Sequence, residues 1–202
     1  MPIPFHDVGD VDELGSAGFL KLEVVADERA TVSAVAGLLV INARGEPLEF
    51  AFNRAELRHR ELWGERLARG HLQRRLVTSL LSVSSYDPRL LACLEDEIDT
   101  DLFGSELRVE VPIVRLGAFV PGNRVVDHLT GEVLDESAPL IPCTWQPAPP
   151  SDDTAAHRLF ERLGAHGLLL EPFERASLGL REVYPPVGVE VGMLRQRDHG
   201  QS

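Results

Sequence analysis

The pattern of hydrophobic and polar positions predicts three strands in the first quarter of the chain. Residues 34–41 are apolar almost throughout, which is typical of a strand that is covered on both faces. Residues 48–52 alternate between apolar and other side chains with a period of two. A third run covers residues 19–25, and polar connections at 27–29 and 44–46 separate the three. We therefore predict three consecutive antiparallel strands.

A long helix is predicted to follow, over about residues 54–83. Leu72, Leu76 and Leu80 recur at every fourth position of its second half, which favours one buried helix face. Gly64 and Gly70 weaken the first half, where the helix is expected to bend or break. The proline at position 88 ends this segment.

The second half of the chain has shorter predicted elements. We expect strands at 90–94 and 107–113, then a small hairpin over 124–134. Five prolines keep residues 136–153 out of regular structure and make them a linker or arm. Two short helices are predicted after it, over about 153–163 and from Pro172, which is a favoured first-turn residue.

These elements indicate an α/β (or α+β) protein, in which a crossover helix joins three antiparallel strands to further strands. This order resembles that of ribonuclease-H-like domains, although other α/β sandwiches also have it. We expect an α/β domain over 1–135, the arm over 136–153, and a helical segment over 154–202 that packs on the same domain.

Charge and composition narrow the functional classes. The 202 residues carry a net charge of −12, with 44% hydrophobic and 26% charged residues, as in globular proteins. An acidic chain repels nucleic acid and anionic lipid at long range. No apolar run reaches the roughly 20 residues that span a bilayer. The first residues lack the features of a signal peptide, so we expect a cytoplasmic protein.

The sequence lacks the usual catalytic signatures for phosphate binding, nucleophilic serine or zinc chemistry. The two cysteines, Cys93 and Cys143, are too few for a disulfide framework or a zinc site. The predictions are therefore no catalytic residue, no resident metal and no cofactor.

An acidic segment over 95–101 leaves one metal-dependent alternative open. In a ribonuclease-H-like frame, a metal site takes acids from the first strand, the first helix and the fourth strand. Glu23, Glu61 and Asp96 (or Glu95) fall in those elements, which would suit two-metal phosphodiester cleavage. The competing interpretation is a solvated acidic loop, because 32 acidic residues place some acid in every element by chance.

Charge is also segregated along the chain. Residues 54–75 hold seven arginines against three glutamates, a net +4, whereas residues 89–110 have a net charge of −5. The charged side chains of these two segments could be solvated or could pair with each other within the fold. Alternatively, the arginine-rich segment could dock a protein partner or bind phosphate. We select Arg58, Trp63 and Arg66 as partner-binding candidates, together with Trp145, which either packs on its own domain or anchors a neighbour.

The function predicted from these features is a non-catalytic protein-interaction or scaffold subunit of a larger bacterial-type intracellular assembly. A protein partner is expected, direct nucleic-acid binding and membrane contact are not, and self-association is left open. The alternative is a divergent ribonuclease-H-like, metal-dependent nuclease, and the third hypothesis is a small-molecule-binding domain.

Overall fold

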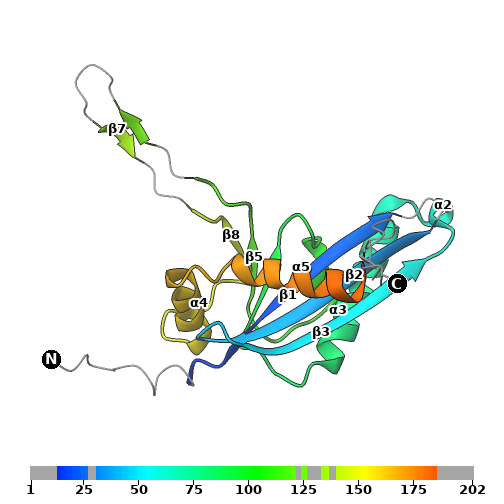
Figure 1. Ribbon diagram of the computed structural model, residues 1–202, viewed down its shortest axis with the longest axis horizontal. Helices are drawn as coiled ribbons and strands as arrows, with labels where there is room; N and C mark the ends of the chain where they lie inside the picture. Colours follow the sequence, from blue (N-terminus) through cyan, green and yellow to red (C-terminus); the bar gives the residue numbers. More distant parts are fainter. Residues whose placement is uncertain (1–12, 27–30, 122–123, 127–132, 137–139, 186–202) are drawn as a thin grey trace, which may run out of the picture.

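A six-stranded sheet forms the centre of the protein (Figure 1). The computed structural model describes residues 13–26, 31–121, 124–126, 133–136 and 140–185. The strand order is β3-β2-β1-β4-β5-β8. The strands are β1 (Ser16–Ala26), β2 (Val32–Asn42), β3 (Pro47–Leu57), β4 (Leu90–Leu94), β5 (Ile113–Leu116) and β8 (Cys143–Gln146).

The three predicted N-terminal strands are confirmed, and each is longer than its hydrophobic pattern indicated. β1 pairs with β2 and β2 with β3, both antiparallel. β2 is buried along almost its whole length, because helices cover both faces of the sheet there. Gly45 has a φ of 84° in the turn between β2 and β3, a conformation that glycine adopts without strain. The predicted connection at 27–29 lies outside the described residues.

The expected helix begins later than its sequence pattern suggested. β3 extends to Leu57, which pairs with Val32, so strand pairing overrides the helical tendency of these residues. A single helical turn, α2 (Arg60–Trp63), is followed by Gly64 with a φ of 68°, and then by α3 (Glu65–Val83). The leucine stripe of α3 is buried against the sheet, as predicted.

The strand directions complete the topology. β4 is parallel to β1, β5 is parallel to β4, and β8 closes the sheet antiparallel to β5. The helical region between β3 and β4 is the crossover that the parallel pair of β1 and β4 requires. The α/β class is confirmed, and the order of β1 to β5, with β2 antiparallel to its neighbours, agrees with the ribonuclease-H-like arrangement that the sequence resembled.

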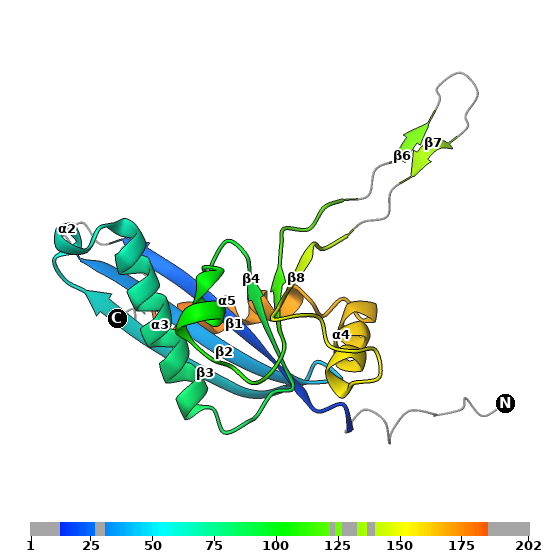
Figure 2. The same ribbon diagram turned by 180° about the vertical axis from the view of Figure 1, so that it is seen from behind.

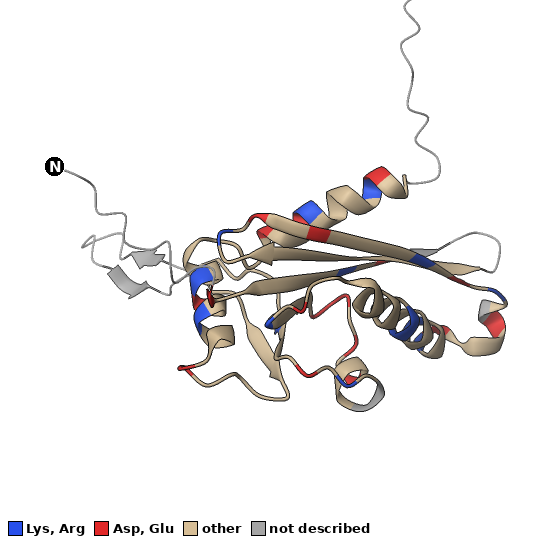
Figure 3. Ribbon diagram, turned by 90° about the horizontal axis from the view of Figure 1, so that it is seen from below, with Lys and Arg blue, Asp and Glu red and all other residues tan. Residues whose placement is uncertain are grey.

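Helices lie on both faces of the sheet (Figure 3). α3 covers one face, and α5 (Glu171–Val183) covers the other, where Phe173 packs edge-to-face on Phe19 with ring centroids 5.3 Å apart. α4 (Ala155–Ala165) adds Leu159 and Leu163 to the core on the α5 side. Each face of the sheet therefore has its own hydrophobic core.

Two predicted features of the second half differ from the structure. Residues 107–111 form no strand: a π-helical turn (Leu102–Glu106) leads into them, and their apolar side chains pack on the core without joining the ladder. The alternating pattern therefore reflected burial rather than strand pairing. The expected arm is regular in part, because β8 lies between Pro142 and Pro147 and pairs with β5.

The hairpin predicted over 124–134 is confirmed as β6 (Arg124–Val126) and β7 (Val133–Glu136), which pair antiparallel and lie beyond the main sheet (Figure 2). Its expected turn falls outside the described residues. Within the described ranges, no helix combines the length and apolar character that crossing a membrane requires.

Candidate functional site

The loop over residues 95–101 lies at the carboxyl end of β4, beside the carboxyl end of the parallel strand β5 and the middle of the parallel strand β1. This is the edge of an open α/β sheet at which ligands usually bind. The loop reaches β1 through Glu97, whose carboxylate pairs with the Lys21 ammonium and accepts a hydrogen bond from the Leu22 backbone N–H at 3.1 Å. The first strand therefore fixes one side of the loop.

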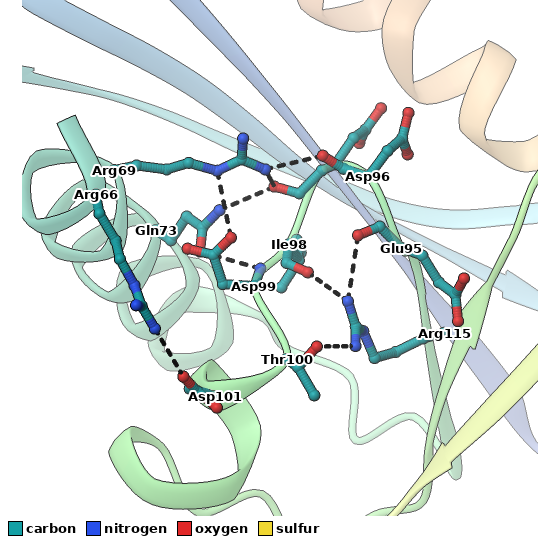
Figure 4. A network of polar contacts seen from close by, with 11 residues as sticks. Arg66, Arg69, Gln73, Glu95, Asp96, Ile98, Asp99, Thr100, Asp101 and Arg115 are labelled. Atoms are coloured by element: carbon teal, nitrogen blue, oxygen red, sulfur yellow. Dashed lines mark hydrogen bonds and ion pairs between the residues drawn. The ribbon is translucent and has the colours of Figure 1, made fainter.

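Helix α3 holds the same loop from the other face of the sheet (Figure 4). Gln73 is 1% exposed; its Nε2 donates to the Glu97 carbonyl at 2.9 Å, and its Oε1 accepts from the Asp99 N–H at 3.2 Å. Arg69 donates to the carbonyls of Asp96 and Glu97 at 2.8 and 3.1 Å. One buried amide and one guanidinium thus bind the loop through its backbone.

Arg115, on the neighbouring strand β5, also binds the loop. The side chain is buried, and its guanidinium donates to the carbonyls of Glu95 and Ile98 at 3.2 and 2.8 Å and to the Thr100 hydroxyl. No carboxylate among the described residues forms an ion pair with it. A desolvated cation that binds only carbonyls and a hydroxyl is costly, so its principal contribution is to define the path of the loop.

Burial raises the pKa of the Glu97 carboxyl, and the hydrogen bond and charge of Lys21 oppose that rise without cancelling it. The side chains of Lys21 and Glu97 are each 13% exposed. The two side chains therefore bind each other, and a ligand can bind either of them only by breaking this ion pair.

A cavity of about 460 Å³ opens on the α5 side of the loop. Its walls combine charged side chains with an apolar surface that includes Phe173. The polar lining comprises Lys21, Glu95, Asp96, Glu174 and Ser177. Three carboxylates and one ammonium give this cavity an acidic character.

A larger groove, of about 1090 Å³, opens on the α3 side of the loop. One wall is the start of α3, and the other is residues 99–102. The polar and aromatic lining comprises Trp63, Glu65, Arg66, Arg69, His71, Gln73, Arg74, Asp99, Thr100 and Asp101. The loop over residues 95–101 is thus the partition between an acidic cavity and an arginine-bearing groove.

The residues of the metal-dependent alternative do not come together. Glu23 accepts a hydrogen bond from the Ser177 hydroxyl of α5 at 3.2 Å, and Glu61 is exposed on α2, 3.6 Å from His59. Asp96 lies in the loop after β4. In the part of the chain that the structure describes, no group of three or more His, Cys, Asp or Glu side chains is placed to hold one metal ion.

The predicted partner-binding residues lie in two places. Trp63 and Arg66 line the groove, and Arg58 is exposed just before α2. Trp145 lies on β8, where its ring packs edge-to-face on Phe160 of α4 at 5.0 Å. Trp145 therefore packs on its own domain.

Sequence reasoning missed Gln73, Arg115 and Glu174. A signal for Gln73 was present, because it is a polar residue next to Leu72 and Leu76 on the buried face of the helix. Arg115 and Glu174 carry no comparable signal, since each belongs to the site only through strand pairing or helix packing.

No protein-family model and no curated protein matches the chain. Among solved structures, it is similar to endonuclease V from Ciona intestinalis, in complex with a 24mer DNA containing an inosine followed by a ribo-adenosine. That similarity has a TM-score of 0.44 and 8% identity, over 84% of this chain and 85% of the other. The catalytic domain of human endonuclease V gives 0.45 and 13%, over 87% and 85%.

These comparisons correct two predictions. The proteins found are endonucleases, so the prediction of a non-catalytic interaction or scaffold subunit is wrong. One of them is bound to DNA, which contradicts the expectation that direct nucleic-acid binding is unlikely. At such low identity the likeness assigns no role to any residue, and the roles considered below rest on the geometry of this chain.

Proposed function

We propose that this chain binds nucleic acid, with the arginines of the groove beside α3 as phosphate contacts. The observation that carries the proposal is the segregation of charge. Residues 54–75 have a net charge of +4 in a chain of −12, so the remaining residues carry −16. A basic segment in an otherwise acidic protein favours contact with a polyanion there. The groove takes three arginines of this segment, and three carboxylates also line it, namely Glu65, Asp99 and Asp101.

The geometry of the arginines supports this role for two of them. Arg66 is 90% exposed on its side chain and lies 3.6 Å from the exposed Asp101 carboxylate. Such an exposed pair is weak, so a phosphate oxygen can replace the carboxylate at little cost. Arg74 is exposed on the same side of α3 and also lines the groove. Arg69 has a different role, because its guanidinium holds the loop.

The test is binding of a fluorescently labelled oligonucleotide, followed by anisotropy over a series of salt concentrations. Arg66→Glu and Arg74→Glu are expected to weaken binding and to reduce the slope of log K against log salt by about 1 each. Arg181→Glu is the matched control, since Arg181 is exposed on α5, on the opposite face of the sheet. Absence of binding at low salt would overturn the proposal, as would equal effects of all three substitutions.

A second candidate function, phosphodiester cleavage, is favoured by the cavity on the α5 side. Glu95, Asp96 and Glu174 supply carboxylate oxygens, which hard divalent cations prefer. As the side chains stand, the described acids do not fit a shared metal centre. We therefore assign no step to a metal.

Cleavage is tested with labelled single and double strands in Mg²⁺, in Mn²⁺ and in a chelator. If the cavity is the reaction site, Asp96→Asn and Glu174→Gln lose cleavage, whereas Glu182→Gln, on the exposed side of α5, retains it. Cleavage that survives both cavity substitutions would exclude the cavity, and no cleavage under any condition would exclude the activity.

A further inference from the structure

Trp63 occupies an unusual position in the groove. It is the last residue of α2, and the positive φ of Gly64 turns the chain there so that α3 begins immediately afterwards. This turn places the indole beside His71, two turns into α3, with ring centroids 4.9 Å apart and planes tilted by 40°. A short helix and one glycine thus hold a large aromatic ring in the lining of the groove.

The Trp63 ring is not used by either hydrophobic core. It is absent from both core clusters and is 38% exposed, and two leucines near it are exposed still further, Leu62 at 80% and Leu67 at 69%. The second tryptophan, Trp145, is packed on Phe160. An indole that is held in place but left accessible is suited to stacking on a flat ligand.

We propose that Trp63 is a stacking platform for an unpaired base, and that the groove takes single-stranded nucleic acid. Arg66 and Arg74 follow Trp63 along the same side of α3, about 12 Å apart along the helix axis. They can contact phosphates on the strand while its base lies on the indole. Aromatic rings beside arginines are the usual means of holding single strands without reading their sequence.

The argument for a single strand over a duplex is geometric. A paired base already has both faces covered by its neighbours in the stack, so it has none to offer an indole. A duplex would meet the arginines but would gain nothing from Trp63. The inference rests on the proposed nucleic-acid binding and specifies its substrate class.

The experiment compares a labelled single strand of about 16 nucleotides, as DNA and as RNA, with a duplex of the same sequence. Trp63→Leu, which keeps an apolar side chain, is expected to weaken single-strand binding about 5- to 150-fold. Duplex binding should change less than twofold. Trp63→Phe should restore part of the single-strand affinity, and Trp145→Leu is the matched control on the other tryptophan.

A spectroscopic readout tests the contact itself. The chain has two tryptophans, so Trp145→Phe leaves Trp63 as the only indole. In that protein, a single strand is expected to quench the indole fluorescence in a saturable manner, with the midpoint found by anisotropy. This measurement remains available if Trp63→Leu does not fold.

Two results would overturn the stacking proposal while leaving nucleic-acid binding intact. One is single-strand affinity that depends on Arg66 and Arg74 but not on Trp63. The other is a single-Trp63 protein that binds the strand without any change in fluorescence. If the unsubstituted protein binds no nucleic acid, the proposed function itself fails.

Discussion

Replacing Gln73 with leucine tests whether the loop over residues 95–101 depends on one buried amide. Two backbone groups of the loop bind this side chain, the Glu97 carbonyl and the Asp99 N–H. The carbonyl keeps a partner in the variant, because Arg69 also donates to it at 3.1 Å. The Asp99 N–H loses its partner in a part-buried position beside the buried Gln73 side chain.

An unsatisfied buried backbone group costs about 1–3 kcal/mol, so we expect Gln73→Leu to lower the free energy of unfolding by about that amount. Urea denaturation measures this loss, and amide hydrogen exchange locates it: exchange over residues 95–101 should rise more than exchange in β2. Leu76→Ala is the control, because it opens a cavity under α3 and removes no hydrogen bond to the loop. A loss below about 0.5 kcal/mol with unchanged loop exchange would refute the reasoning.

Three further predictions concern the core, the buried ion pair and the thiols. Leu76→Ala should cost about 2–5 kcal/mol in urea denaturation, since its fully buried side chain packs between α3 and the sheet; a near-neutral result would place the stripe outside the core. The raised pKa of Glu97 means that the folded protein holds this proton more tightly than the unfolded chain. Its ionisation therefore lowers stability as pH rises from the unfolded value through the folded one. Measured between pH 4 and pH 7, Glu97→Gln should gain stability relative to the unsubstituted protein, and the opposite trend would show that the Lys21 pair outweighs burial. Burial raises the pKa of the Cys93 thiol to about 12, whereas Cys143 is exposed, so a thiol reagent should label Cys143 alone in the folded protein and both after unfolding; rapid native labelling of Cys93 would contradict this.

The parts of the fold that could be predicted are those in which burial and local structure agree. The apolar run at 34–41 marks β2, which is buried on both faces as such a run predicts. The alternation at 48–52 marks β3 correctly, although Leu48 and Phe52 are 38% and 43% exposed. Residues 107–111 mislead because they alternate and are partly buried but pair with no strand. Burial produces the pattern, and hydrogen bonding decides the structure.

The candidate site was less predictable than the fold. The acidic segment at 95–101 was recognised from composition, but the side chains that hold it, from α3, β1 and β5, bind mainly its backbone, which has no sequence signature. Glu174 joins the cavity from α5, far along the chain, and only the packing of that helix brings it there. Trp63 and the neighbouring arginines were selected together from the sequence, which also predicted a break at Gly64; the contact between the indole and His71 is visible only in the structure.

The loop that separates the groove from the cavity has a thermodynamic consequence. Because one segment lines both spaces, a ligand on one side that favours a particular loop position changes the affinity for a ligand on the other side. Thermodynamic reciprocity requires the two changes in affinity to be equal. If a strand in the groove changes the affinity of the cavity for its ligand by some factor, that ligand changes the affinity of the groove for the strand by the same factor. If the loop shifts when either space is occupied, the two spaces become one linked system, and a substitution such as Gln73→Leu alters binding in both.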